Sequence, residues 1–121
     1  MNASNWFEIP AHDFNRASRY YETVLDIQLK ADNEFAGLKM GIFPHDKPGS
    51  GGAVVEGKDH VPGSAGTLIY LHAPQLDAVL ARIEPAGGAV LLPKMDLGDE
   101  IGYIAIMRDT EGNHIGLHQP V

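Results

Sequence analysis

The sequence predicts an α+β fold made of two βαβββ modules in tandem, whose mixed sheets curl around a central cavity. Short runs in which apolar and polar residues alternate, as in half-buried strands, occur in both halves of the chain. Each half also carries one amphipathic helical stretch directly after its first strand. The two halves superimpose at an offset of 62 residues, which aligns Glu8 with Tyr70 and Val54 with Gly116. We interpret this agreement as an internal repeat.

The first module, residues 1–57, begins with a strand in NWFEIPA, and Asp13 after it can cap a helix. The helix is predicted from apolar side chains at helical spacing, namely Phe14, Ala17, Tyr21, Val24 and Leu25. Three more strands are predicted in IQLKADNE, GLKMGIFP and GGAVVEG. The segment HDKPGSG between the last two has the composition of a loop.

Residues 58–65 are predicted to be a linker, because GKDHVPGSAG is rich in Gly, Pro and Ser. The second module, residues 66–121, repeats the same order of elements. A strand in GTLIYLHA is followed by a helix in PQLDAVLARIEPAGG, and three more strands are predicted in AVLLPKMDLG, GYIAIMRD and NHIGLHQP. A tight turn before the last strand is indicated by Asp109, Gly112 and Asn113.

Composition and charge restrict the classes of function. The formal net charge of −7 argues against nucleic-acid binding, because phosphate contacts need clustered Lys and Arg. The absence of Cys excludes disulfides and thiolate metal sites. No apolar run reaches the roughly 20 residues that a membrane helix needs. The start, MNASNWFEIP, lacks the basic and apolar segments of a signal peptide, so we expect a cytoplasmic protein without a membrane partner.

Side chains in a strand alternate between its two faces. Four strands have one wholly apolar face, which we assign to the helices: Phe7, Ile9 and Ala11; Ala53 and Val55; Ile69, Leu71 and Ala73; Ile115 and Leu117. The opposite face carries Trp6, Glu8, Val54, Glu56, Leu68, Tyr70, His72, His114, Gly116 and His118. That face could simply be solvated. Its large apolar side chains favour partial enclosure instead, and two sheets that curl toward each other would form a concave ligand site.

The chain resembles the vicinal oxygen chelate superfamily, which includes glyoxalase I, bleomycin-resistance proteins and extradiol dioxygenases. The stretch AHDFNRASRYYETVLDIQL is similar to a superfamily motif around the first helix, and LARIEPAGG is similar to the end of its second helix. GYIAIMRDTEGNHIGLHQP is similar to the closing signature, with Thr110 where Pro is usual. Paired βαβββ modules are also that superfamily's architecture. The second half most resembles the small glyoxalase-like proteins related to lactoylglutathione lyase.

The resemblance implies a divalent metal, held by His and Glu from the first and last strands of each module, that acts as a Lewis acid. Those positions fall here on Trp6, Leu68, Val54 and Gly116. None of these side chains can bind a hard or borderline cation. We therefore expect the family's metal site to be absent and no cofactor to be needed.

One pleat further along each strand, on the same face, lie Glu8, Glu56, Tyr70 and His118. If the modules pair as in the superfamily, all four approach one axis. Glu8 and His118 could then serve as general base and acid. Two carboxylates and an imidazole could instead hold a metal in a shifted register, or the group could be a polar rim without a specific role.

The expected ligand contacts combine a stacking wall from Trp6 with polar groups from Tyr70, Glu56, His72 and His114. His45 and His60 lie in Gly/Pro-rich loops and are expected to be solvated. The expected function is binding of a small organic molecule between the modules of a homodimeric protein, with or without acid–base isomerase or lyase chemistry. The alternatives are a metal-dependent lyase or dioxygenase with displaced ligands, and a non-catalytic structural or partner-binding module.

Overall fold

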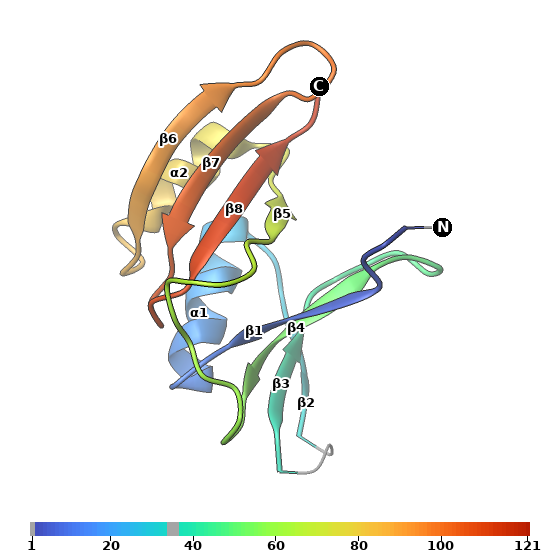
Figure 1. The fold of residues 1–121 in the computed structure, drawn as a ribbon. Helices are drawn as coiled ribbons and strands as arrows, with labels where there is room; N and C mark the ends of the chain where they lie inside the picture. Colours follow the sequence, from blue (N-terminus) through green and yellow to red (C-terminus); the bar gives the residue numbers. More distant parts are fainter. Residues whose placement is uncertain (1, 34–36) are drawn as a thin grey trace.

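The computed structural model describes residues 2–33 and 37–121. The first module contains β1 (Trp6–Pro10), α1 (Phe14–Leu25), β2 (Lys30–Asp32), β3 (Lys39–Ile42) and β4 (Gly51–Glu56). The second contains β5 (Tyr70–His72), α2 (Leu76–Ile83), β6 (Ala89–Asp96), β7 (Tyr103–Arg108) and β8 (His114–Gln119). The order βαβββ therefore occurs twice, which confirms the predicted fold class (Figure 1). Residue 34, the last of the predicted strand IQLKADNE, lies outside the described residues.

Each module forms its own mixed sheet. The strand order is β1-β4-β3-β2 in the first sheet and β5-β8-β7-β6 in the second. In each sheet the first strand of the module runs parallel to the last one, and the remaining neighbours are antiparallel. The helix after the first strand provides the crossover that a parallel pair requires. The two sheets are separate and do not close into a barrel.

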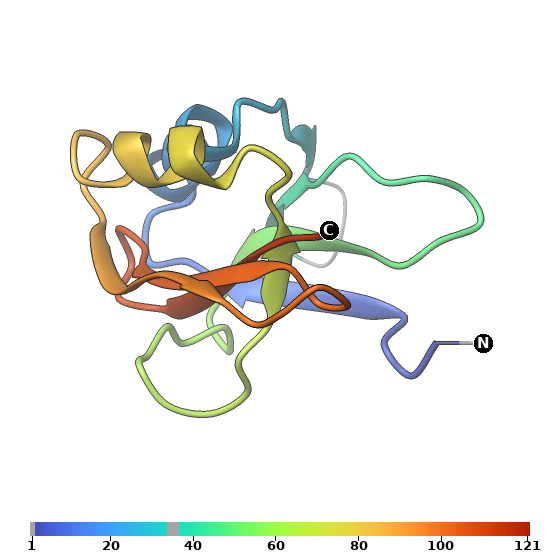
Figure 2. The ribbon, with the colours of Figure 1, turned by 90° about the horizontal axis from the view of Figure 1, so that it is seen from above.

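Helices α1 and α2 lie next to each other on one side of both sheets, as Figure 2 shows from above. The main core fills the space between these layers. From α1 it takes Ala17, Tyr20, Tyr21 and Val24, and from α2 it takes Leu76, Val79 and Ile83. The Asp13 side chain caps α1 by accepting a hydrogen bond from the backbone N–H of Arg16 at 3.1 Å, as predicted. Among the described residues no helix is both long and apolar enough to cross a membrane.

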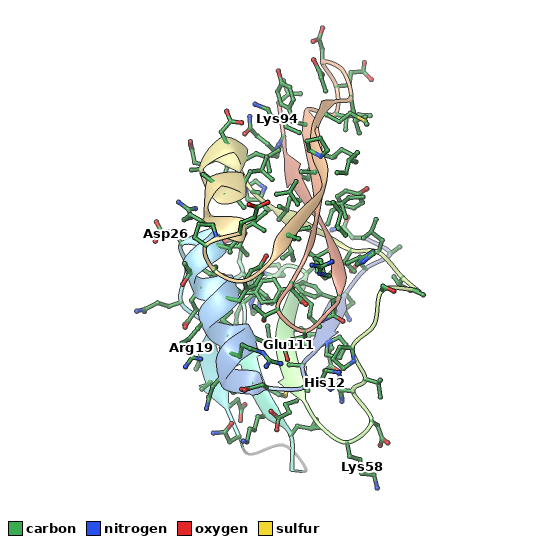
Figure 3. The ribbon with its side chains drawn as sticks, turned by 90° about the vertical axis from the view of Figure 1, so that its left-hand side faces the viewer. His12, Arg19, Asp26, Lys58, Lys94 and Glu111 are labelled. Carbon is green, nitrogen blue, oxygen red and sulfur yellow. The ribbon has the colours of Figure 1, made fainter. Side chains whose placement is uncertain are left out.

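The turn between β7 and β8 joins the two modules through buried carboxylates. Asp109 accepts hydrogen bonds from the backbone N–H of Asn113 at 3.0 Å and from the Tyr21 hydroxyl at 2.5 Å. Burial first, and then the neighbouring Asp109, raises the pKa of Tyr21, so its hydroxyl stays a donor. Glu111 reaches the start of α1, beside His12 in Figure 3, and accepts from the Arg16 guanidinium at 2.8 Å. The turn thus fixes the second sheet against the first helix.

The face of each sheet that points away from the helices, which we call the open face, carries the predicted polar residues of the first strands. In the first sheet, Trp6 and Glu8 lie on it, while Ile9 is buried in the main core. In the second sheet, paired strands share a face, so Tyr70 lies on the same side as Gly116, and His72 on the same side as His118. For β1, β5 and β8 the predicted alternation is therefore correct.

The predicted facing of β4 is wrong. Val54 pairs with Ile9, is fully buried and belongs to the main core, so it faces the helices. Ala53 and Val55 lie on the open face, where they form a second small apolar cluster with Met40. The repeat offset is 62 residues between the first strands but 63 between the last strands, because Glu8 pairs with Ala53 where Tyr70 pairs with Gly116. A slip of one residue moves every side chain of a strand to the other face.

Candidate functional site

A cavity of about 570 Å³ lies along β1, and we call it the β1 pocket. Its walls come from Trp6–Pro10, from linker residues between 61 and 69, and from Ile106 and residues 113–115 of the second sheet. It therefore occupies the junction of the two modules. Of the predicted site residues, it brings together Trp6, Glu8 and His114.

Trp6 and Glu8 are joined by a hydrogen bond at one end of this pocket. The indole Nε1–H of Trp6 donates to Glu8 Oε2 at 3.2 Å. Because alternate residues of a strand share a face, β1 itself places these two side chains next to each other. The bond holds the indole by its edge, and 42% of the Trp6 surface is still exposed. A large apolar side chain in this setting is suited to contact a ligand rather than to fill the core.

Glu8 is also paired with a residue of the linker. Its Oε1 lies 2.8 Å from Nε2 of His60, and only 22% of the His60 side chain is exposed. The hydrogen bond from His60 lowers the pKa of Glu8, more than partial burial raises it, and the bond from Trp6 acts in the same direction. Glu8 is therefore an anion at neutral pH and a poor general acid.

The predicted solvation of His60 is wrong, and its role was missed. Its Nδ1 is buried and has no hydrogen-bond partner among the described residues. Because Glu8 is the acceptor at Nε2, we assign the ring proton to that nitrogen. The only signal in the sequence was a His within a linker that follows directly on the first sheet. The sequence does not indicate that the linker folds back on β1.

Tyr70 and His72 line a different cavity, which we call the β5 pocket. It has a volume of about 730 Å³ and lies between β5 and the loop that connects β3 with β4. The Tyr70 ring lies over Gly116, where an added Cβ would be 2.4 Å from Cδ2 of the ring. The space left by glycine on β8 is thus filled by a tyrosine from the neighbouring strand.

The structure does not bring His118 to Glu8. Nε2 of His118 donates to the backbone carbonyl of Ile101 at 2.6 Å, in the turn between β6 and β7. His118 lines neither the β1 pocket nor the β5 pocket. The proposed pairing of Glu8 as base with His118 as acid has no geometric support.

Glu56 caps a helix and does not face the β1 pocket. Its Oε1 accepts a hydrogen bond from the backbone N–H of Phe14 at 2.8 Å, at the start of α1. In the second module, Gln119 accepts from the backbone N–H of Leu76 at 3.0 Å, at the start of α2. These equivalent caps are 63 residues apart, so the structural counterpart of Glu56 is Gln119 and not His118.

The residues at the family's metal positions do not fit a metal ion. With the corrected facing of β4, these positions hold Trp6, Leu68, Ala53 and Gly116, and none offers a lone pair to a cation. The set in the shifted register is separated as well, since Glu56 binds the start of α1 and His118 binds a backbone carbonyl. In residues 2–33 and 37–121, no three His, Asp or Glu side chains are grouped to hold an ion.

Comparison with known proteins gives relatives over nearly the whole chain. A glyoxylase-like domain-containing protein of Didymella fabae is 32% identical over 111 residues, which cover 88% of this chain and 84% of the relative. A glyoxalase/bleomycin resistance protein from Albidiferax ferrireducens superimposes with a TM-score of 0.74 at 18% identity, covering 96% of this chain and 97% of that one. TnmS3, an antibiotic binding protein from a Streptomyces species, gives 0.67 at 23% identity, covering 100% and 98%. No family model matches the chain.

Proposed function

The chain belongs to the glyoxalase-like proteins of the vicinal oxygen chelate superfamily, and from this premise we propose that it binds a small organic molecule in the β1 pocket without the family's metal. The observation that carries the proposal is the half-exposed indole of Trp6, held by its edge on a charged carboxylate inside a cavity of about 570 Å³. Such cavities, mostly apolar with a few fixed polar groups, are typical ligand sites.

Binding without turnover is the form of this proposal that the residues support best. General acid–base catalysis needs a group whose pKa lies near the operating pH. The pKa of Glu8 is instead lowered by His60, and both of its oxygens already accept hydrogen bonds. A neighbour in fold, TnmS3, is described as an antibiotic binding protein, which is consistent with a binding role for this architecture.

The proposal is tested with a broad panel of metabolites and natural products in a thermal unfolding assay. A ligand at 100 times its Kd stabilises the native state by about 2.7 kcal/mol. Trp6→Ala should abolish the shift, whereas Met95→Ala, which truncates a side chain of the same 42% exposure outside the pocket, should leave it unchanged. A panel without any shift contradicts the proposal, as does a shift that survives Trp6→Ala.

Metal content separates this proposal from a metal-dependent lyase or dioxygenase. Protein purified without chelators should carry no stoichiometric Zn, Ni, Mn or Fe, because no suitable ligand set is formed by the described residues. About one bound ion per chain that is lost in Glu8→Ala would favour the metal-dependent alternative.

We further propose that the chain forms a homodimer in the cytoplasm through its open faces. Large apolar side chains are left exposed there, among them Leu68 at 40% and Tyr70 at 46%. Covering such a patch is a common reason for self-association. Sedimentation equilibrium should give twice the monomer mass, and a monomer at micromolar concentration would refute the dimer.

A further inference from the structure

We infer that the ligand of the β1 pocket is an aromatic molecule that carries a protonated amine or a similar planar cation. The inference rests on the proposed function, because it specifies the ligand class for that same pocket. It follows from the charges in the pocket wall, from the arrangement of Trp6 and Glu8, and from the group that Glu8 already binds.

The wall of the β1 pocket carries one negative charge and no balancing positive charge. Glu8 is its only carboxylate, and within the described part of the chain no Lys or Arg lines the pocket. His114 is the one other titratable side chain of the wall. An anionic ligand would have to enter beside Glu8 without a partner for its own charge, which is costly. A cation would instead compensate the carboxylate.

The geometry of β1 places an aromatic surface next to that carboxylate. Because Nε1 of Trp6 donates to Glu8 Oε2 at 3.2 Å, the indole edge is fixed at the anion and the rest of the ring is free to contact a ligand. Cations bind favourably over the face of an indole. An amine beside a carboxylate also forms a charge-assisted hydrogen bond, which is stronger than a neutral one. One ligand with a ring and an amine can use both features.

His60 provides an example of the group that Glu8 accepts. Its imidazole is a planar ring whose N–H reaches Oε1 at 2.8 Å. Each oxygen of a carboxylate can accept about two hydrogen bonds. With one donor on each oxygen, from His60 and from Trp6, Glu8 still has capacity for a donor from the ligand. The net charge of −7 would also attract a cation at long range.

Three probes with one ring system test this inference: 1-naphthylmethylamine, 1-naphthylmethanol and 1-naphthoate, which are a cation, a neutral molecule and an anion. Binding is followed by the indole N–H resonance of Trp6, the single tryptophan of the chain. The amine should bind about ten-fold more tightly than the alcohol, from the ion pair and the cation–π contact together. Naphthoate should bind most weakly.

Two variants identify the source of the preference. Glu8→Gln should lower the affinity of the amine to that of the alcohol and leave the alcohol unaffected. Glu56→Gln removes the same charge from a residue outside the pocket and should leave the ten-fold preference intact. Added salt should weaken the amine alone.

The possible results separate this inference from the proposed function. Equal affinities for the three probes, or a preference for naphthoate, overturn the ligand class while binding in the pocket stands. The same holds if the naphthalene probes fail but neutral or anionic members of the metabolite panel bind. If nothing in either set binds, the proposed function itself fails, and this inference with it.

Discussion

Glu111 carries the contact between the modules, and its contribution to stability can be calculated from its pKa. The side chain is fully buried and accepts hydrogen bonds from the backbone N–H groups of His12 and Asp13, each at 2.9 Å, and from the Arg16 guanidinium. Burial alone would raise the pKa of Glu111, but these hydrogen bonds and the charge of Arg16 outweigh it and hold the pKa at about 2, against an ordinary value of 4.5. The difference is worth about 3 kcal/mol of folding free energy.

The sign of this contribution gives a pH prediction. A lowered folded-state pKa stabilises the protein above the unfolded-state value, so the full contribution of Glu111 is present above pH 4.5 and is lost as the pH falls toward 2. Glu111→Gln should therefore cost about 3 kcal/mol at neutral pH and almost nothing near pH 2. Urea unfolding across this range measures both, with Glu100→Gln in the exposed β6–β7 turn as the control. A cost below about 1 kcal/mol at neutral pH, or one that does not change with pH, would refute the reasoning.

Three further predictions concern the site and its surroundings. Gly116→Ala should destabilise the fold by about 1 kcal/mol because its Cβ meets the Tyr70 ring, and in a Tyr70→Ala background urea unfolding should show no cost; an unchanged cost would contradict the contact. Glu56→Gln should lower stability by about 0.5–1 kcal/mol through the weakened cap of α1, while calorimetry gives an unchanged ligand affinity; a loss of affinity would return Glu56 to the site. In His60→Ala, an NMR titration should find the pKa of Glu8 closer to its ordinary 4.5, and no change would mean that His60 does not control it.

The fold was predictable because the repeat and the alternation are both local in sequence. In β1, apolar and polar residues alternate strictly, so the facing of Glu8 could be assigned correctly. In β4, the run Gly51–Val55 is buried on both faces, and its composition gives no alternation from which to assign a face. The fixed offset of 62 then transferred the wrong facing to Val54 and Glu56. The error concerns one strand and leaves the metal positions without ligands in either case.

The candidate site was only partly predictable, because its composition depends on contacts between distant segments. Trp6 and Glu8 lie on one strand and could be paired from their spacing. The partner of Glu8 is His60, 52 residues away in a linker whose composition predicts a loop but not its path. The distance of His118 from this group was equally hidden, because it depends on how the two sheets are oriented and not on the pattern within β8.

A crystal structure of the protein with a hit from the metabolite panel tests the central claim most directly. We predict ligand density against the Trp6 indole in the β1 pocket, with a nitrogen of the ligand within hydrogen-bond distance of the Glu8 carboxylate. Ligand density in the β5 pocket with none beside Trp6 would contradict the assignment of the site.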